Sequence, residues 1–277
     1  MATITEIFSF LLVPRIWVGL LFCIFGFFLL KTLKLQKPIR FKVLTLIFIL
    51  FAIIPILPAG WFSTGMEMHP SPVCATTKPI LFFMYKGFVP TIFILILSFI
   101  GITSFIGNKL YCGWTCPLGA IQELAHYIKL PTSWKIFLPF YATNTVRILV
   151  FIAFFPLAIY GGISLYTYFN PFEFFHWYFA LYTSLVMLIT LILSVFVFRP
   201  FCYILCPIGL LSWVIEQFSL HKLKVNTKKC NGCRICVKKA NCPAVEAIVE
   251  GKKLRPDCHV CGRCVDLCPE KAFEFKR

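Results

Sequence analysis

The chain has 277 residues, of which 59% are hydrophobic and only 14% are charged. This composition excludes an ordinary soluble domain and is typical of a membrane protein with a polar appendage. The net charge is +16, but no recognisable nucleic-acid-binding module accompanies it, so we expect no nucleic-acid partner.

Five apolar segments are candidates to cross a bilayer, which requires about 20 mostly apolar residues. The first is the weakest, because Arg15 obscures its start, and a tilted or half-inserted helix is the alternative for it. We predict an all-α polytopic membrane bundle of about five transmembrane helices. The segments are 14–31, 41–58, 88–107, 147–166 and 178–198.

The orientation of the bundle follows from Lys and Arg in its short loops, which favour the cytoplasmic side. The loop 31–42 holds five such residues, whereas 167–177 holds none. We therefore expect a multi-pass protein of the bacterial cytoplasmic (inner) membrane, with the N-terminus outside and the C-terminal tail in the cytoplasm.

A cysteine-containing phrase occurs twice in the chain. LYCGWTCPLG at 110–119 returns as PFCYILCPIG at 200–209, and both follow an apolar segment. This order predicts a pseudo-repeat in which both phrases emerge on the cytoplasmic side. The cysteines of the two phrases are Cys112 and Cys116 in the first and Cys202 and Cys206 in the second.

An amphipathic stretch follows each phrase, over 118–128 and 208–218. Apolar residues of these stretches line one helical face, and the polar residues Gln122, Glu123 and Glu216 lie off it or near its end. This pattern predicts two short helices that lie at the membrane interface.

Three roles are open for the four thiols of the repeat. As structural groups they would be small buried hydrophobic side chains. As a redox dithiol pair they would sit at electropositive helix ends, where a lowered pKa favours the thiolate. As four ligands they would hold a metal ion or a further cluster. Either functional role would place an electron relay between the tail and the membrane.

The tail from His221 to Arg277 holds eight cysteines, and 14 Lys and Arg against 6 Asp and Glu. Its run CHVCGRCVDLCP at 258–269 has the spacing of bacterial ferredoxins, in which the fourth cysteine ligates the other of two [4Fe–4S] clusters. We expect Gly262 to give this loop room and the proline after each fourth cysteine to start a helix. The two ligand sets are Cys230, Cys233, Cys236 and Cys268 for one cluster, and Cys258, Cys261, Cys264 and Cys242 for the other.

Zinc is the alternative for a short cysteine pair, but it takes four tetrahedral ligands and does not explain two three-cysteine loops that each end in Cys-Pro. The first run departs from the usual spacing, since five residues separate Cys236 from Cys242. The insertion should displace that corner of the cluster. Basic residues around the clusters should raise their potentials or form a docking face for an acidic partner.

The two outer loops hold the remaining polar candidates for a quinone site or an outer metal site. A carboxylate beside a histidine could accept quinol protons, whereas soft ligands next to a histidine would suit copper, and ordinary interfacial residues are the simpler interpretation. No histidine lies at the centre of a span, which disfavours a transmembrane haem and makes a quinone the simpler carrier. The candidates are Glu67, His69, Cys74, Glu173 and His176.

The two phrases, the cysteine-rich tail and their order resemble the NapH family of ferredoxin-type membrane proteins, with MauN and the C-terminal half of NosR as relatives. The resemblance covers roughly residues 41–277. It implies four spans, a cytoplasmic two-cluster tail, and electron passage from the quinol pool toward a periplasmic reductase, usually with a soluble iron–sulfur protein. The chain departs from the family by its extra N-terminal span and by the long Cys236–Cys242 gap.

We therefore predict three parts: an extra membrane helix and basic loop at 1–40, a membrane domain at 41–220, and an α+β two-cluster ferredoxin-like domain at 221–277. The predicted function is iron–sulfur electron transfer between quinol or quinone and a redox partner. The sequence offers no self-contained catalytic site. Two alternatives are an assembly factor that reduces or delivers metal to a periplasmic enzyme, and a redox sensor.

Overall fold

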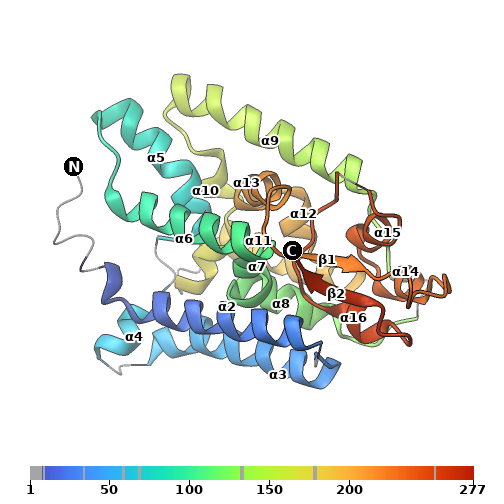
Figure 1. Ribbon diagram of the computed structural model, residues 1–277. Coiled ribbons are helices and arrows are strands. Elements are labelled where there is room, and N and C mark those ends of the chain that lie inside the picture. The colour runs from blue at the N-terminus through green and yellow to red at the C-terminus, as the bar shows by residue number, and fades with distance from the viewer. Residues whose placement is uncertain are drawn as a thin grey trace.

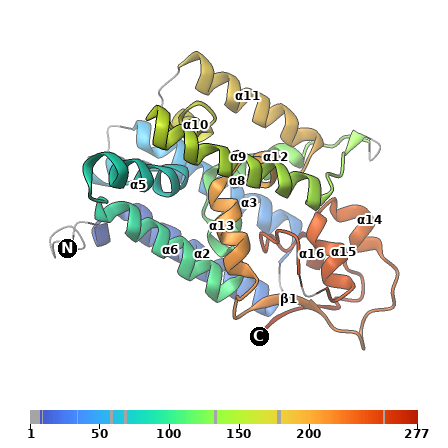
Figure 2. The same ribbon diagram turned by 90° about the horizontal axis from the view of Figure 1, so that it is seen from above.

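The structure is a computed structural model that describes residues 8, 10–33, 35–57, 60–67, 70–131, 134–176, 180–252 and 254–277. Long helices surround a group of short ones, and the cysteine-rich tail packs against one end of this bundle (Figure 1, Figure 2). Most residues of the described part are helical, as the composition predicts.

Three apolar helices are long enough to cross a membrane: α2 (Pro14–Thr32), α3 with its continuation (Lys37–Ile56) and α9 (Phe140–Gly161). The continuation of α3 (Lys37–Phe48) consists of a π-helical turn, η1 (Ile49–Ile53), and a 3₁₀ turn, η2 (Ile54–Ile56). The other two predicted spans form shorter helices, so the count of five transmembrane helices is not confirmed. These are α6 (Thr91–Gly107, 17 residues) and α11 (Leu181–Phe196, 16 residues).

Both shorter helices end where the chain turns back into the bundle. Asn108 and Lys109 after α6, and Arg199 after α11, adopt the left-handed conformation with φ of 59°, 50° and 50°. Each turn is followed by two short helices. These are α7 (Leu110–Trp114) and α8 (Pro117–His126) in the first repeat, and α12 (Pro200–Ile204) and α13 (Pro207–Glu216) in the second.

The two short helices predicted after the cysteine phrases are present and pack against other helices of the protein, while their place at the membrane interface stays a prediction. Helix α8 packs between α3 and α11, and α13 packs against α6, α9 and α5 (Pro72–Lys86). The hydroxyl of Thr115, just before α8, donates a hydrogen bond of 3.0 Å to the carbonyl of Gly19, which lies 13 residues, roughly 20 Å, before the end of α2. The cysteine phrases therefore re-enter the bundle instead of lying at its surface (Figure 1).

The polar residues that we placed off the apolar face are also buried, since Gln122, Glu123 and Glu216 are at most 2% exposed. Side-chain and backbone groups of neighbouring elements pair with them, as described below. The amphipathic pattern thus marks a helix with polar partners inside the protein.

The pseudo-repeat is visible in the backbone itself. Cys116 and Cys206 both occupy the residue before a helix, with the same φ of −67° and ψ of 116°. Pro117 and Pro207 follow at the first helical position, where a missing amide hydrogen costs nothing.

The tail contains two antiparallel strands, β1 (Lys222–Val225) and β2 (Phe273–Lys276), which pair Lys222 with Lys276 and Val225 with Phe273. Helix α2 reaches this sheet, because the rings of Phe27 and Phe275 lie 5.4 Å apart. Three short helices complete the tail: α14 (Ile235–Ala240), α15 (Pro243–Val249) and α16 (Arg263–Leu267).

Short helices on the face opposite the tail complete the chain. They are α4 (Trp61–Gly65), α10 (Leu165–Tyr168) and η4 (Pro171–His176).

Candidate iron–sulfur electron-transfer site

The two cysteine runs of the tail share one loop conformation. In each run the second and fourth residues after the first cysteine have positive φ: 74° at Gly232 and 52° at Arg234, and 47° at Val260 and 73° at Gly262. Both runs therefore curl tightly, as three thiolates around one face of a cluster require. Gly262 is needed for a second reason, since a Cβ there would lie 1.8 Å from Leu35.

The first ligand set lines a single cavity. Its wall includes all four assigned cysteines, together with backbone of the Asn231–Gly232 turn and the apolar side chains of Val225 and Phe273. A cavity with four converging thiols fits an iron–sulfur cluster, which is bound through cysteine sulfur. The cysteines are Cys230, Cys233, Cys236 and Cys268.

The second ligand set is more deeply buried. Burial raises the pKa of Cys264, and the nearby thiols of Cys258, Cys261 and Cys242 raise it further, which shows that the four lie together. A cluster bound here would take these cysteines as thiolates, so its insertion would release protons.

The five-residue gap before Cys242 forms α14, and Asn241 in the left-handed conformation then returns the chain to Cys242 at the start of α15. Pro243 thus starts a helix, as predicted. The same prediction is wrong at Cys268–Pro269, because a turn leads from there into β2.

Within the described ranges, no group of three or more His, Cys, Asp or Glu is arranged to hold a single metal ion. A four-iron cluster makes a different demand, since each of its thiolates binds a different iron and the ligands stand further apart.

The loop of the second ligand set lies directly on α7. The indole of Trp114 donates a hydrogen bond of 3.0 Å to the carbonyl of Val260, and the amide of Asn108 donates one of 3.0 Å to the carbonyl of Cys258. Gly113 permits this approach, because a Cβ there would lie 2.0 Å from the carbonyl oxygen of His259. The second ligand set and the first cysteine phrase are therefore in direct contact.

A buried ion-pair network holds the first phrase on the tail side. The carboxylate of Glu123 on α8 pairs with Arg40 of α3, at 2.9 Å, and with Arg199 before α12. Both arginines also donate to carbonyls of α7, Arg40 to Gly113 at 2.6 Å and Arg199 to Cys112 at 2.8 Å. Burial alone would raise the pKa of Glu123, but the two guanidinium groups outweigh it and lower the pKa to about 2.

A second network connects the other repeat to the tail. Asp257, next to Cys258, forms buried ion pairs with Lys109 and with Arg147 of α9, the latter at 2.7 Å. Lys109 also lies 3.6 Å from Glu216, whose carboxylate accepts a hydrogen bond of 3.2 Å from the amide of Cys258. Burial raises the pKa of Glu216, which Lys109 offsets only in part.

The two networks were not foreseen from the sequence. By the rule that basic loop residues face the cytoplasm, Lys109 and Arg199 are expected at a wet surface, yet both are 0% exposed. The signal that could have revealed them is their place: each stands just before a cysteine phrase, at the turn where the chain re-enters the bundle.

The four thiols of the repeat lie close to one another inside the bundle. Burial raises the pKa of Cys112 to about 11, and the thiol of Cys202 contributes, while burial and both of these thiols raise the pKa of Cys116. The expectation that electropositive surroundings lower these pKa values is therefore wrong. The polar contacts are crosswise, since Gln122 of the first repeat lies 3.5 Å from the sulfur of Cys202.

The comparisons with known proteins match the same repeat. A family described as "4Fe-4S binding domain" matches residues 88–135 and 179–226, which are the two halves of the repeat. An uncharacterized protein of Methanocaldococcus jannaschii is 31% identical over 186 residues, which cover 63% of this chain and 67% of that protein. The ferredoxin-type protein NapH of Haemophilus influenzae is 30% identical over 184 residues, covering 61% of this chain and 63% of NapH.

This chain belongs to the NapH-like family of ferredoxin-type proteins. The regulatory protein NosR of Stutzerimonas stutzeri is 26% identical over 246 residues, or 79% of this chain and 32% of NosR. The chain thus spans less than two thirds of this NapH and about a third of NosR. No solved structure matches it. Its relatives and its apolar helices indicate a membrane protein of ferredoxin type.

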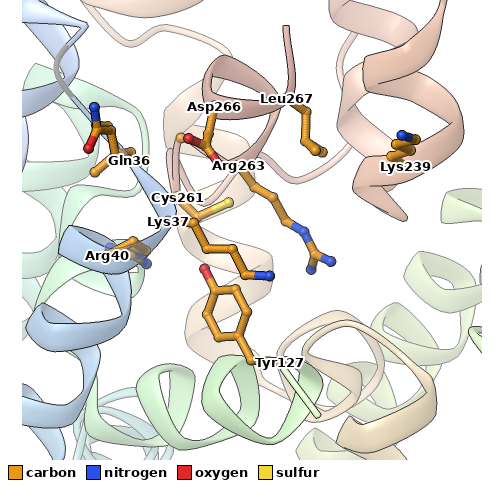
Figure 3. A pocket seen from close by; sticks show the side chains of 11 residues that line it. Gln36, Lys37, Arg40, Tyr127, Lys239, Cys261, Arg263, Asp266 and Leu267 are labelled. Atoms are coloured by element: carbon orange, nitrogen blue, oxygen red, sulfur yellow. The ribbon is translucent and has the colours of Figure 1, made fainter. Parts of the chain in front are cut away.

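In this NapH-like chain, an open pocket lies beside Cys261 at the junction of membrane bundle and tail (Figure 3). Lys37 and Arg263 stand near the ring of Tyr127, with their charged groups 5.5 and 5.9 Å from its centre. Lys239 of α14 lines the same pocket. These cations place positive charge next to the second ligand set, which favours the reduced, more anionic state of a cluster.

The outer-loop candidates are brought together only in part. Asn170 donates a hydrogen bond of 2.8 Å to Glu173, whose carboxylate lies 3.9 Å from the sulfur of Cys74. Glu67 lies elsewhere and accepts a hydrogen bond from Arg15 through its carbonyl, at 2.6 Å. His69 and the side chain of His176 lie outside the described residues.

Proposed function

We propose that this chain holds two [4Fe–4S] clusters and passes electrons between the quinol pool and a redox partner, which is a periplasmic reductase or a soluble iron–sulfur protein. Quinol oxidation is the proposed direction. Its relatives include proteins named for ferredoxin-type character and for electron transport, which supports the electron-carrying part of the proposal.

One observation carries the proposal: the loop of the second ligand set rests on α7 through Trp114, Asn108 and Gly113. If the tail were a soluble ferredoxin domain attached only by a linker, we would expect its cluster loop to face solvent and not the bundle. Here the buried ion pairs of Asp257 fix the loop within the protein interior. The contact gives electrons a short route between the membrane interior and the tail.

We assign the end of that route farthest from the membrane bundle to the first ligand set. Cys233 is exposed, and Arg234 and Lys238 beside it are exposed or partly exposed. An acidic carrier would be attracted to this face. Cys236 connects the two sets, because it lies near Cys268 and Cys233 on one side and Cys264 on the other.

The four thiols of the repeat lie beside the route, and we propose that they extend it as a redox dithiol pair or as ligands of a further metal or cluster. Cys23 of α2 lies beside the first phrase, since its sulfur is 3.3 Å from the hydroxyl of Thr115. The raised pKa values of Cys112 and Cys116 mean that the thiols are protonated at neutral pH, so that oxidation or metal binding there releases protons.

Single cysteine variants test the two ligand sets. Cys261→Ser and Cys233→Ser should each lose one cluster and keep the other, giving roughly four instead of eight irons per chain. Cys74→Ser is the matched control, because Cys74 is buried on the opposite face of the bundle and should leave the iron content unchanged. Iron and acid-labile sulfide, measured on anaerobically purified protein together with its EPR spectrum, check the prediction. Zinc in place of iron, or full iron in both variants, would contradict it.

A further inference from the structure

A narrow cavity lies inside the bundle on α7, and nothing described so far uses it. Its polar side chains are Arg15 at the start of α2, and Tyr111 and Thr115 of the first cysteine phrase. Its walls are otherwise apolar and partly aromatic, and they enclose a small cavity of about 30 Å³. The apolar residues are Ile16, Phe51, Pro70, Pro72, Ile96 and Phe99.

The second repeat contains a larger cavity at the equivalent place, whose lining is less polar. Ninety residues further along, Val186 and Ile189 take the places of Ile96 and Phe99, and they line a cavity against α12. In that cavity Phe201 stands for Tyr111 and Leu205 for Thr115, so its lining offers almost no polar surface. The repeat geometry alone therefore explains a cavity, and the hydroxyl groups of Tyr111 and Thr115 have no counterpart at the equivalent positions of the second one.

Two further features single out the first cavity. Phe51 in its wall belongs to the π-helical turn η1, and such turns inside α-helices frequently occur at functional sites. Arg15 is held at its mouth by the carbonyl of Glu67, on the face opposite the tail. An apolar cleft with a few convergent polar groups is the usual form of a small-molecule site.

We propose that this cavity binds the ring of a quinol, whose hydroxyl groups meet Tyr111 and Arg15 while its apolar tail leaves toward the lipid. The proposal rests on the quinol-oxidising function proposed above and assigns a site to it. A quinol ring is flat and apolar with a polar group at each end, which matches aromatic walls that have donors at separate positions.

Helix α7 connects this site to the tail. Tyr111 and Thr115 face the cavity, whereas Gly113 and Trp114 contact the loop of the second ligand set. A helix with its side chains is roughly 10–12 Å across, and this thickness separates its two sides. Oxidation of one quinol to quinone releases two electrons and two protons. A cluster held by Cys258, Cys261, Cys264 and Cys242 would accept these electrons one at a time across α7. The protons would leave past Arg15, beside which Glu67 is exposed.

The test is a binding titration of the full chain in quinone-free lipid nanodiscs. The probe is the fluorescent quinol analogue 2-heptyl-4-hydroxyquinoline N-oxide, whose emission is quenched when it binds. Tyr111→Phe should raise the Kd about tenfold, the effect of one lost hydrogen bond. The double variant Tyr111→Phe/Thr115→Leu, which copies the lining of the second cavity, should raise it at least as much. Phe201→Leu, the matched control in the second repeat, should leave the Kd within about twofold.

Cluster absorbance and EPR spectra of each variant serve as the folding control, and Arg15→Gln offers a second route if the double variant does not load clusters. An unchanged Kd in Tyr111→Phe and Arg15→Gln, with menaquinol still reducing the clusters of the unaltered protein, would overturn the assigned site but leave the proposed function intact. Failure of the unaltered protein both to bind the analogue and to be reduced by menaquinol would overturn both. Weakened binding in the first-repeat variants alone supports the site.

Discussion

Replacing Gly113 by alanine is expected to lift the second cluster loop from α7. A Cβ at this position would lie 2.0 Å from the carbonyl oxygen of His259, a backbone atom that no side-chain rotation can remove. The loop must shift by more than 1 Å, which breaks the hydrogen bonds from Trp114 and Asn108. We expect a loss of about 3 kcal/mol from overpacking and unpaired buried groups, and reduction of the clusters by quinol at least tenfold slower.

Gly101→Ala is the matched control for this variant. Gly101 lies in α6, and a Cβ there would meet only the side chain of Ile215 at 3.7 Å, an ordinary contact. The alanine should be neutral or stabilise the helix by about 0.5–1 kcal/mol. The measurements are thermal unfolding in detergent and stopped-flow reduction. Equal reduction rates in Gly113→Ala and the unaltered protein would contradict the role given to the contact.

Replacing Glu123 by glutamine should destabilise the protein by about 3–5 kcal/mol, because it leaves the buried charges of Arg40 and Arg199 uncompensated. Glutamine keeps the size of the side chain, so a cavity does not confound the result. The measurement is thermal unfolding at pH 7. The matched control is Glu250→Gln, which removes only exposed pairs with Arg234 and Lys252 and should leave the unfolding temperature nearly unchanged.

The pH dependence of the same variant gives an independent check. The pKa of Glu123 is lowered from its ordinary 4.5 to about 2, so its carboxylate stabilises the fold fully above about pH 4.5 and progressively less as pH falls toward 2. The difference in free energy of unfolding between the unaltered protein and Glu123→Gln should therefore be constant from pH 7 to 5. It should become smaller as the pH falls below 5. A difference that does not change between pH 5 and 3 would show that Glu123 is not held as a carboxylate by the two arginines.

The sequence was sufficient for the features that depend on local spacing. The two cysteine phrases predicted a pseudo-repeat, and Cys116 and Cys206 have identical backbone angles. The family resemblance is confirmed, because spacing and order of the cysteines carry it. Composition and hydropathy likewise predicted a helical membrane protein.

The packing of the cysteine phrases inside the helix bundle could not be predicted from hydropathy. A short amphipathic helix gives the same pattern whether its polar face meets water or buried cations, and Glu123 meets Arg40 and Arg199. The partners come from elements 83 and 76 residues away in the chain. The role of Asp257 could not be predicted from the sequence either. It is not a cluster ligand, and its partners Lys109 and Arg147 lie far from it in the chain.

The N-terminal helix, which lies outside the region of family resemblance, gains a role from the structure. Helix α2 supports α7 through the contact of Gly19 with Thr115, and it supplies Arg15 to the cavity. Gly26 lets it approach Trp114, since a Cβ there would lie 2.2 Å from the indole. This helix, which is long and apolar enough to cross a membrane, therefore also contributes to the cavity on α7.

The most direct test of the central claim is an anaerobic EPR titration of the purified chain with menaquinol and ubiquinol analogues. If the chain conducts electrons between the quinol pool and two clusters, reduced-cluster signals should appear with at least one quinol and disappear again when the oxidised quinone is added in excess. Two clusters that dithionite reduces, but that no quinol or quinone ever brings to equilibrium, would contradict the account.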